Sequence, residues 1–230
     1  MSGNRLLDAL RRECPDLDSC AERVELPPGV ELAGPTRATS YVFFPVTGVL
    51  STIVRVESGV GAEAFMVGRE GLLGVEGLFG MPLGVGHFVQ QAAGESIRIP
   101  LQELGERLDG NRRAARLVQA FAAYALLYSQ QTAACNALHS VEQRTCRWIL
   151  GMADRLDSAT IVATQELLAD MLGVRRQTVG EVAVDLQRSG AIAYRRSDIT
   201  VVGRPLLESR ACECYRATRA RYRSIVEPLL

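Results

Sequence analysis

Residues 164–203 contain a spacing of small, flexible and β-branched residues that is compatible with few folds. Ala169 is small enough for two helices to cross closely, and Gly173 suits the left-handed backbone that ends a helix and starts a tight turn. Val179 lies where a second helix would pack back onto the first. This spacing predicts a helix-turn-helix, with a first helix over about 165–172 and a second from about Arg175 to Arg188.

The exposed side of the second predicted helix carries residue types that recognise DNA bases. Arg pairs with guanine and Gln with adenine, and a recognition helix enters the major groove by its first turn. After Gly190, segments 191–196 and 199–203 predict a hairpin across Ser197-Asp198, with arginines at its tip for phosphate contacts. A helical hairpin with a charged outer face, as many enzymes contain, is the alternative. The predicted DNA-contacting residues are Thr164, which also suits an N-cap, Gln165, Arg175, Arg176, Gln177, Thr178, Arg195 and Arg196.

The segment from Val24 to Pro100 has the pattern of short strands. Apolar runs with β-branched residues are separated by Gly and Pro, which predicts an antiparallel β-roll or jelly roll. The first two strands are expected to form a hairpin across Val46-Thr47-Gly48. The expected strands are 41–45, 49–56, 62–67, 88–92 and 96–99.

A long helix is expected over about 111–138, after the cap residues Asp109 and Asn111. A heptad stripe on it predicts that the helix pairs with a copy of itself. A helix packed on its own β-domain is the alternative. The stripe consists of Leu117, Phe121, Tyr124, Tyr128, Gln131, Cys135 and Leu138.

Three further segments complete the chain. A second helix is expected over about 141–156 and a short loop over 157–163. Residues 205–230 are expected to form one more helix. The predicted domains are a sensor at 1–139 that includes the long helix, a winged helix-turn-helix at 140–208, and a C-terminal helical extension at 209–230.

Charge and hydropathy limit the partners of the chain. The net charge is zero, but residues 140–230 carry 14 Arg against 11 acidic residues, whereas residues 1–139 carry 12 Arg against 15. The basic half is the one expected to face a polyanion. There is no run of about 18 apolar residues and no signal-like N-terminus, so a cytoplasmic protein without a membrane partner is expected.

These motifs together resemble the Crp/Fnr family of bacterial transcription regulators. The strongest likeness is T-Q-E-L-L-A-D-M-L-G-V-R-R-Q-T-V-G-E-V followed by L-Q-R-S-G-A-I-A-Y-R-R-S-D-I-T-V-V, with a weaker one in Y-V-F-F-P-V-T-G-V-L-S and V-G-R-E-G-L-L-G. The resemblance implies a β-roll sensor domain, a long dimerisation helix and a winged helix-turn-helix. It adds Glu181 to the positions that read bases and gives Thr178 a backbone contact. Glu181 and Val184 stand where the family's best-known member is basic, so its operator sequence cannot be transferred.

The sensor region lacks the features that bind a cyclic nucleotide. Family members that bind cyclic AMP have an Arg-Ser/Thr-Ala signature, whereas residues 82–93 contain no Arg or Ser. A buried phosphate without a cation is costly, so no tight cyclic-nucleotide binding and no cofactor are expected. Arg69 is the main candidate for a substitute cation. The candidate ligand-binding residues are Arg69, Glu70, Gly71, His87 and Tyr128.

The cysteines and histidines indicate neither a metal site nor an enzyme. Cys14 and Cys20 are only a pair, unlike the three-Cys cluster of Fnr-type oxygen sensors, and Cys212 and Cys214 supply only two ligands. Cys135 on the predicted seam would allow an intersubunit disulfide, although ordinary packing is favoured. A catalytic cupin generally needs two or three His around one metal, and no nucleophile–base pair or phosphate loop stands out. No catalytic or metal-binding residue is predicted.

The sequence therefore predicts a homodimeric DNA-binding regulator that acts on a palindromic operator under an unidentified signal in the β-roll. RNA polymerase is a further partner to consider. The first alternative is a constitutive DNA binder, which a sealed apolar sensor core would favour over a polar pocket near Glu70, His87 and Tyr128. The second, less favoured, is a metal-dependent cupin enzyme with a DNA-binding tail.

Overall fold

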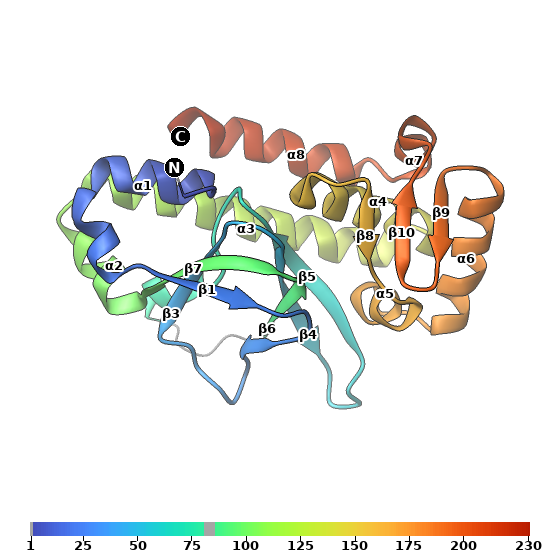
Figure 1. Cartoon of the computed structure of the whole chain (residues 1–230), viewed down its shortest axis with the longest axis horizontal. Coiled ribbons are helices and arrows are strands. Elements are labelled where there is room, and N and C mark those ends of the chain that lie inside the picture. The colour runs from blue at the N-terminus through green and yellow to red at the C-terminus, as the bar shows by residue number, and fades with distance from the viewer. Residues whose placement is uncertain (1, 81–85) are drawn as a thin grey trace.

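Two antiparallel sheets form the N-terminal half of the computed structural model, which describes residues 2–80 and 86–230 (Figure 1). One sheet has the strand order β1-β7-β3 and the other β2-β6-β4-β5. Apolar side chains of both sheets belong to one core, as the predicted β-roll requires. The strands are β1 (Glu22–Leu26), β2 (Glu31–Ala33), β3 (Tyr41–Pro45), β4 (Val49–Arg55), β5 (Gly61–Val67), β6 (Gly86–Ala92) and β7 (Gly94–Pro100).

The predicted hairpin between β3 and β4 was wrong. β3 pairs with β7, whereas β4 pairs with β5 and β6, so residues 46–48 carry the chain from one sheet to the other. The backbone N–H groups of Val46 and Thr47 donate to the carbonyl oxygen of Glu95 in β7. Gly48 has a φ of +74°, and a Cβ atom there would lie 2.5 Å from the carbonyl oxygen of Ala92. Gly48 therefore allows the chain to pass from one sheet to the other through a bend that locally resembles a hairpin turn.

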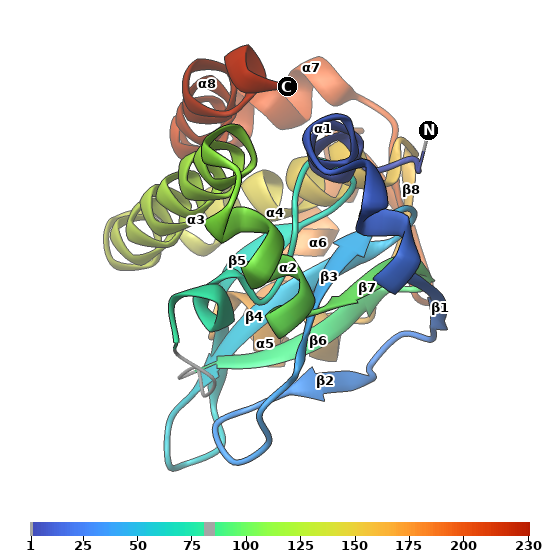
Figure 2. The same ribbon diagram turned by 90° about the vertical axis from the view of Figure 1, so that its left-hand side faces the viewer.

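Helix α3 (Arg112–Leu138) has the bounds predicted for the long helix, because the side chain of Asn111 accepts hydrogen bonds from the N–H groups of Arg113 and Ala114. Helix α8 (Cys214–Ile225) lies along α3 and runs antiparallel to it, as Figures 1 and 2 both show. The other N-terminal helices are α1 (Arg5–Glu13), η1 (Pro15–Cys20), η2 (Val75–Phe79) and α2 (Leu101–Asp109).

The heptad stripe of α3 packs inside its own chain, so the prediction that it forms the dimer seam was wrong. The rings of Phe121 and Tyr128 meet Phe65 of β5 edge-on, and Tyr124 meets Tyr222 of α8 with ring centroids 5.2 Å apart. The sequence pattern could not distinguish these intramolecular neighbours from a second copy of α3. The stripe residues that are buried are Leu117, Phe121, Tyr124, Tyr128 and Cys135, and at its end Leu138 is 79% exposed.

The C-terminal half contains the predicted helix-turn-helix and a small sheet of order β8-β10-β9. Residues 160–162, expected in a loop, form a strand that pairs with β10, so the wing has three strands. Arg195 faces Asp198 across the hairpin, which places the turn at Arg196-Ser197, one residue earlier than predicted. The elements are α4 (Val141–Leu156), β8 (Thr160–Val162), α5 (Gln165–Leu172), α6 (Arg176–Arg188), β9 (Ile192–Arg195), β10 (Asp198–Val201) and α7 (Arg204–Arg210).

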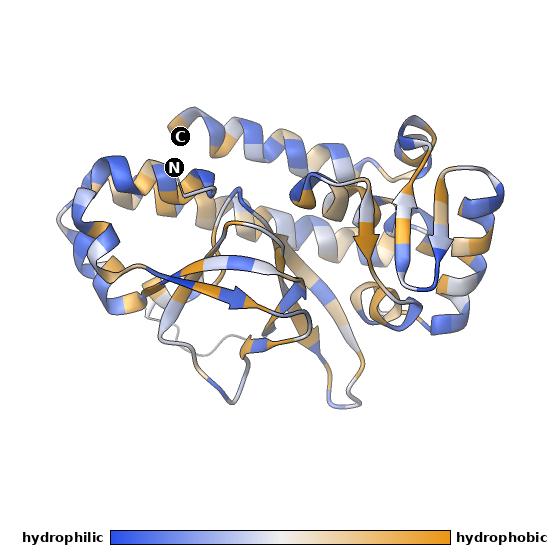
Figure 3. Cartoon of the chain, in the orientation of Figure 1, coloured by the Kyte–Doolittle hydropathy of each residue, from blue (hydrophilic) through white to orange (hydrophobic). Residues whose placement is uncertain are grey.

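The C-terminal segment is not the single helix predicted. Residues 211–213 interrupt it between α7 and α8, and a short 3-10 turn, η3 (Glu227–Leu229), follows. The hydropathy colouring shows α8 as largely hydrophilic and α5 as largely hydrophobic (Figure 3). Within residues 2–80 and 86–230, no helix has the length and apolar character needed to cross a membrane.

Candidate functional site

The helix-turn-helix is held by the residues that its spacing indicated. Thr164 caps α5 by accepting a hydrogen bond at Oγ1 from the N–H of Leu167 at 3.1 Å. Gly173 ends α5 with a φ of +63°, and Ala169 and Val179 are buried where α5 and α6 pack together. A helix cap, a glycine with left-handed backbone and a close contact between helices each depend on residues near one another in sequence. The predicted bounds of both helices are therefore within one residue of the observed ones.

The first turn of α6 presents most of its predicted base-reading side chains to solvent. Arg175 is the N-cap residue of α6, and Arg175, Arg176, Gln177 and Glu181 are exposed, whereas Thr178 is half-buried. Arg176 forms an ion pair with Glu166 of α5 at 2.8 Å, and Gln177 donates a hydrogen bond to Glu181 at 3.1 Å. Both interactions lie on the surface, where such pairs contribute little stability and exchange readily for other partners.

A shallow groove of about 180 Å³ runs between α6 and the wing. Gln165 lies on its α5 side and Arg196 on its wing side, so two predicted DNA contacts that are distant in sequence meet at one surface. Tyr194 of β9 donates its hydroxyl to the carbonyl oxygen of Ala163 at 2.9 Å, which ties the wing to the start of α5. Arg195, like Arg196, is exposed near the wing tip.

Helix α4 supports the motif through buried polar groups that no sequence motif indicated. Arg144 donates to the carbonyl oxygen of Leu172 at 3.0 Å and so satisfies an unpaired group at the end of α5. Trp148 donates its indole N–H to Glu63 of β5 at 3.3 Å. Glu63 lies two residues before the core residue Phe65 on the same strand, so both side chains point to the same face of the sheet. This spacing was the only signal in the sequence that the carboxyl group of Glu63 points inward.

Residues 143–210 match the family described as the Crp-like helix-turn-helix domain. This segment is a Crp-like helix-turn-helix domain. No curated protein sequence matches the chain. The match runs from the first turn of α4 to the end of α7, and it includes the cap, the turn glycine and the exposed first turn of α6.

Solved structures extend the likeness to most of the chain. FixK2 from Bradyrhizobium japonicum has a TM-score of 0.72 at 17% identity and covers 84% of this chain and 98% of its own. The c-di-GMP-responsive regulator CLP from Xanthomonas campestris has a TM-score of 0.67 at 17% identity, with 84% and 99% covered. A putative Crp/Fnr regulator from Eubacterium rectale has a TM-score of 0.71 at 13% identity, with 94% and 100% covered. At these identities the likeness establishes that the chain has the Crp/Fnr fold.

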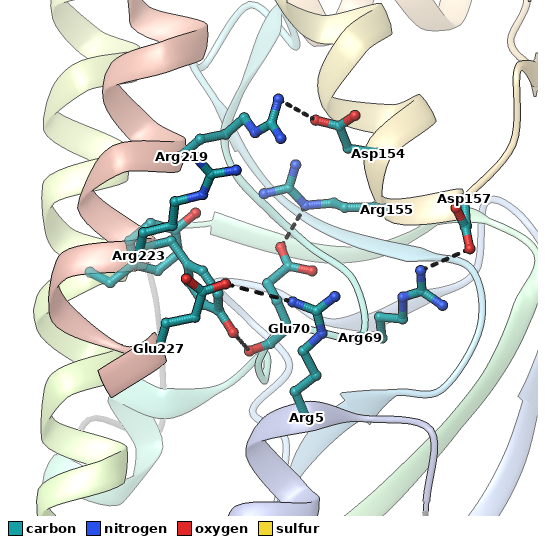
Figure 4. Close-up of a pocket in the computed structure, with 11 residues that line it drawn as sticks. Arg5, Arg69, Glu70, Asp154, Arg155, Asp157, Arg219, Arg223 and Glu227 are labelled. Carbon is teal, nitrogen blue, oxygen red and sulfur yellow. Dashed lines mark hydrogen bonds and ion pairs between the residues drawn. The ribbon is translucent and has the colours of Figure 1, made fainter. Parts of the chain in front are cut away.

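A polar cavity of about 420 Å³ lies where the β-roll meets α4, α1 and α8 of this Crp/Fnr fold (Figure 4). Glu70 forms an ion pair with Arg155 of α4 at 2.7 Å, and Arg69 forms one with Asp157 at 3.1 Å. Five arginines and four carboxylates line the cavity, so most of its charge is neutralised internally. Its lining residues are Arg5, Arg69, Glu70, Tyr124, Asp154, Arg155, Asp157, Arg219, Tyr222, Arg223 and Glu227.

The other predicted ligand residues have different surroundings. Tyr128 is buried beneath the guanidinium group of Arg155 and lines a small adjoining cavity. His87 pairs with Glu31 at 3.1 Å and lines neither cavity. A Cβ atom on Gly71 would lie 1.9 Å from the ring of Phe121, so Gly71 is needed for close packing. Residues 82–85 of the segment predicted to lack a phosphate-binding signature lie outside the described residues.

Proposed function

We propose that this protein is a sequence-specific transcription regulator that acts as a homodimer on a palindromic operator and is not an enzyme. The observation that carries the proposal is the exposed first turn of α6, with Arg175, Arg176 and Gln177 beside the wing arginines on a Crp-like domain. An N-terminal turn of this kind reads bases in the major groove, while arginines on a wing neutralise phosphates.

The face of α3 opposite its buried stripe supports the dimer. Eight exposed residues lie along this face, separated alternately by four and three residues. Leu126, near the centre, is 60% exposed. Small alanines along such a stripe allow two helices to approach closely. Pairing two copies here would present two α6 helices to successive major grooves, about 34 Å apart. The positions are Arg112, Arg116, Gln119, Ala123, Leu126, Gln130, Ala133 and Ala137.

Selection from random duplex DNA by the purified full-length chain tests the DNA-binding function. We expect a palindromic sequence to be enriched and its affinity to fall steeply with salt. Arg176→Ala should weaken binding by about 5-fold to 150-fold and relax preference at one position in each half-site. Arg37→Ala, an exposed arginine in the β-roll, is the matched control and should leave affinity unchanged. Failure to enrich any sequence, together with salt-insensitive binding, would contradict the proposal.

The signal is proposed to be an anionic small molecule in the cavity beside Arg69. The cavity volume is within the usual range of ligand sites, and its walls belong to both the β-roll and the elements that follow α3. A ligand there would contact both halves of the chain and so could bind their two arrangements unequally. Cyclic AMP and cyclic GMP are not expected to bind tightly, and micromolar binding by calorimetry would contradict this.

Cyclic di-GMP is a suitable first probe because it carries two phosphates for the arginines of the cavity. Binding that weakens at least about tenfold in Arg69→Ala and Arg219→Ala, but not in Arg37→Ala, would support a ligand site. The internal ion pairs of the cavity favour the second candidate, a constitutive regulator. Operator affinity that is identical with and without cell extract would support that candidate over signal control.

A further inference from the structure

Three cysteines and a histidine that are distant in sequence meet where α3 ends. Cys135 belongs to the last turn of α3 and His139 follows that helix, while Cys212 lies in the break between α7 and α8 and Cys214 begins α8. The Sγ atoms of Cys135 and Cys212 are 3.5 Å apart, and Sγ of Cys214 is 3.7 Å from Nδ1 of His139. All four potential ligand atoms lie within 4.8 Å of one another, and all three thiols are buried.

These distances match a tetrahedral site for one metal ion. Zinc–sulfur bonds of about 2.3 Å at tetrahedral angles hold neighbouring sulfurs about 3.8 Å apart. A disulfide would require the two sulfurs to be about 2.05 Å apart. An iron–sulfur cluster must fit several inorganic atoms between its ligands and therefore needs a wider cage than these side chains form.

The groups around the cluster orient its ligands as a zinc site requires. The imidazole of His139 contacts the carboxylate of Glu213 through Nε2 at 3.2 Å, so the proton is held on Nε2 and the lone pair of Nδ1 faces the sulfurs. Carboxylate–histidine–zinc arrangements have this geometry. Gln131 donates its amide N–H to Sγ of Cys214 at 3.1 Å, which favours a thiolate there.

Two arginines of α4 lie near the cluster. Three thiolates and a zinc ion carry one net negative charge, and the guanidinium groups of Arg144 and Arg147 on α4 interact electrostatically with Cys135 and Cys212. Their positive charges would offset the net negative charge of a zinc-loaded site.

We propose that Cys135, His139, Cys212 and Cys214 bind one zinc ion. The ion would fasten the segment between α7 and α8 to the end of α3, at the junction from which α4 leads into the Crp-like domain. Such a link would hold α8 along α3 and restrict the angle between α3 and α4. This inference is independent of the DNA sequence that the protein recognises.

Metal content of the purified full-length chain is the first test. We expect about one zinc per chain in the wild type and in Cys20→Ser, a cysteine outside the cluster that serves as the matched control. Cys135→Ser and Cys214→Ser should retain less than about a tenth of the zinc. Glu213→Gln should keep the stoichiometry but weaken zinc affinity by about 10-fold to 100-fold, because it perturbs only the orientation of His139.

A cobalt-loaded wild type supplies a readout that does not depend on the folding of a variant. Co²⁺ should give the sulfur-to-metal charge-transfer band and the intense d–d bands of a tetrahedral thiolate site. Chelation should accelerate tryptic cleavage at the arginines of α8, because that helix loses its link to α3. Absence of stoichiometric metal after reconstitution, or a Cys135–Cys212 disulfide formed equally fast with and without zinc, would overturn the proposal.

Discussion

Trp148 donates its indole N–H to Glu63 at 3.3 Å, and this hydrogen bond links α4 to strand β5 of the β-roll. Ser51 donates to the same carboxylate oxygen at 2.8 Å, and the three side chains are fully buried or nearly so. A buried polar group of this kind tolerates little displacement, because any loss of a donor leaves the carboxyl group unsatisfied. The contact therefore fixes how the start of the Crp-like domain rests on the β-roll.

Folding stability is expected to depend on pH through Glu63. Burial raises its pKa from 4.5 to about 7. Because the folded-state pKa lies above the unfolded one, the stabilisation by this group is complete below about pH 4.5 and is lost as pH rises through about 7. Glu63→Gln keeps an acceptor for Ser51 and Trp148 and should be more stable than the wild type above pH 7, by roughly 3 kcal/mol at most.

Urea unfolding measured across this pH window tests that expectation, with the fluorescence of Trp148, the only tryptophan, as the signal. Glu57→Gln, which removes an exposed carboxylate from the turn after β4, is the control and should reproduce the wild-type profile. A Glu63→Gln profile parallel to the wild type at every pH would show that Glu63 does not titrate in this range.

Two glycine substitutions should shift stability in opposite directions. Gly71→Ala should destabilise the protein by about 2–3 kcal/mol, because the new methyl group would overlap the ring of Phe121. Gly105→Ala, in the interior of α2 with no atom within 4 Å of the new Cβ, should stabilise it by about 0.5–1 kcal/mol. Thermal unfolding of both variants checks the pair. Normal stability of Gly71→Ala would mean that Phe121 can move aside.

Local sequence signals predict the helix-turn-helix, whereas the features that the sequence does not predict depend on long-range contacts. The side chain of Thr164 bonds to a backbone N–H three residues later, and Gly173 acts through its own backbone conformation, so both roles can be recognised without knowing the fold. Tyr124 belongs to a heptad whether it meets another α3 or, as here, Tyr222 of the same chain. Likewise Cys135 gains its neighbour Cys212 only because α8 folds back along α3. Periodicity identifies the buried face of an element but not its partner.

Dimerisation is expected to depend on the exposed face of α3. Leu126→Glu places a charge at the centre of that face and should convert the dimer to a monomer without unfolding it, because Leu126 is 60% exposed in the single chain. Val56→Glu, at an apolar residue with 61% exposure after β4, should leave the oligomeric state unchanged. Sedimentation velocity of the two variants separates these outcomes. A Leu126→Glu variant that remains dimeric would move the interface away from α3.

The wing arginines are expected to contribute affinity without sequence preference. Arg196 occupies the hairpin turn with a φ of +56°, where glycine is less strained than arginine. Arg196→Gly relieves about 1 kcal/mol of backbone strain in the folded state but raises the chain entropy of the unfolded state. The stability of the variant should therefore change little.

Loss of the phosphate contact should lower the slope of log affinity against log salt by about 1 per wing while leaving the selected sequence the same. Arg176→Ala should instead relax base preference, so salt titrations of both variants on the selected operator and on a half-site mutant distinguish the two roles. Altered base preference in Arg196→Gly would show that the wing reads sequence.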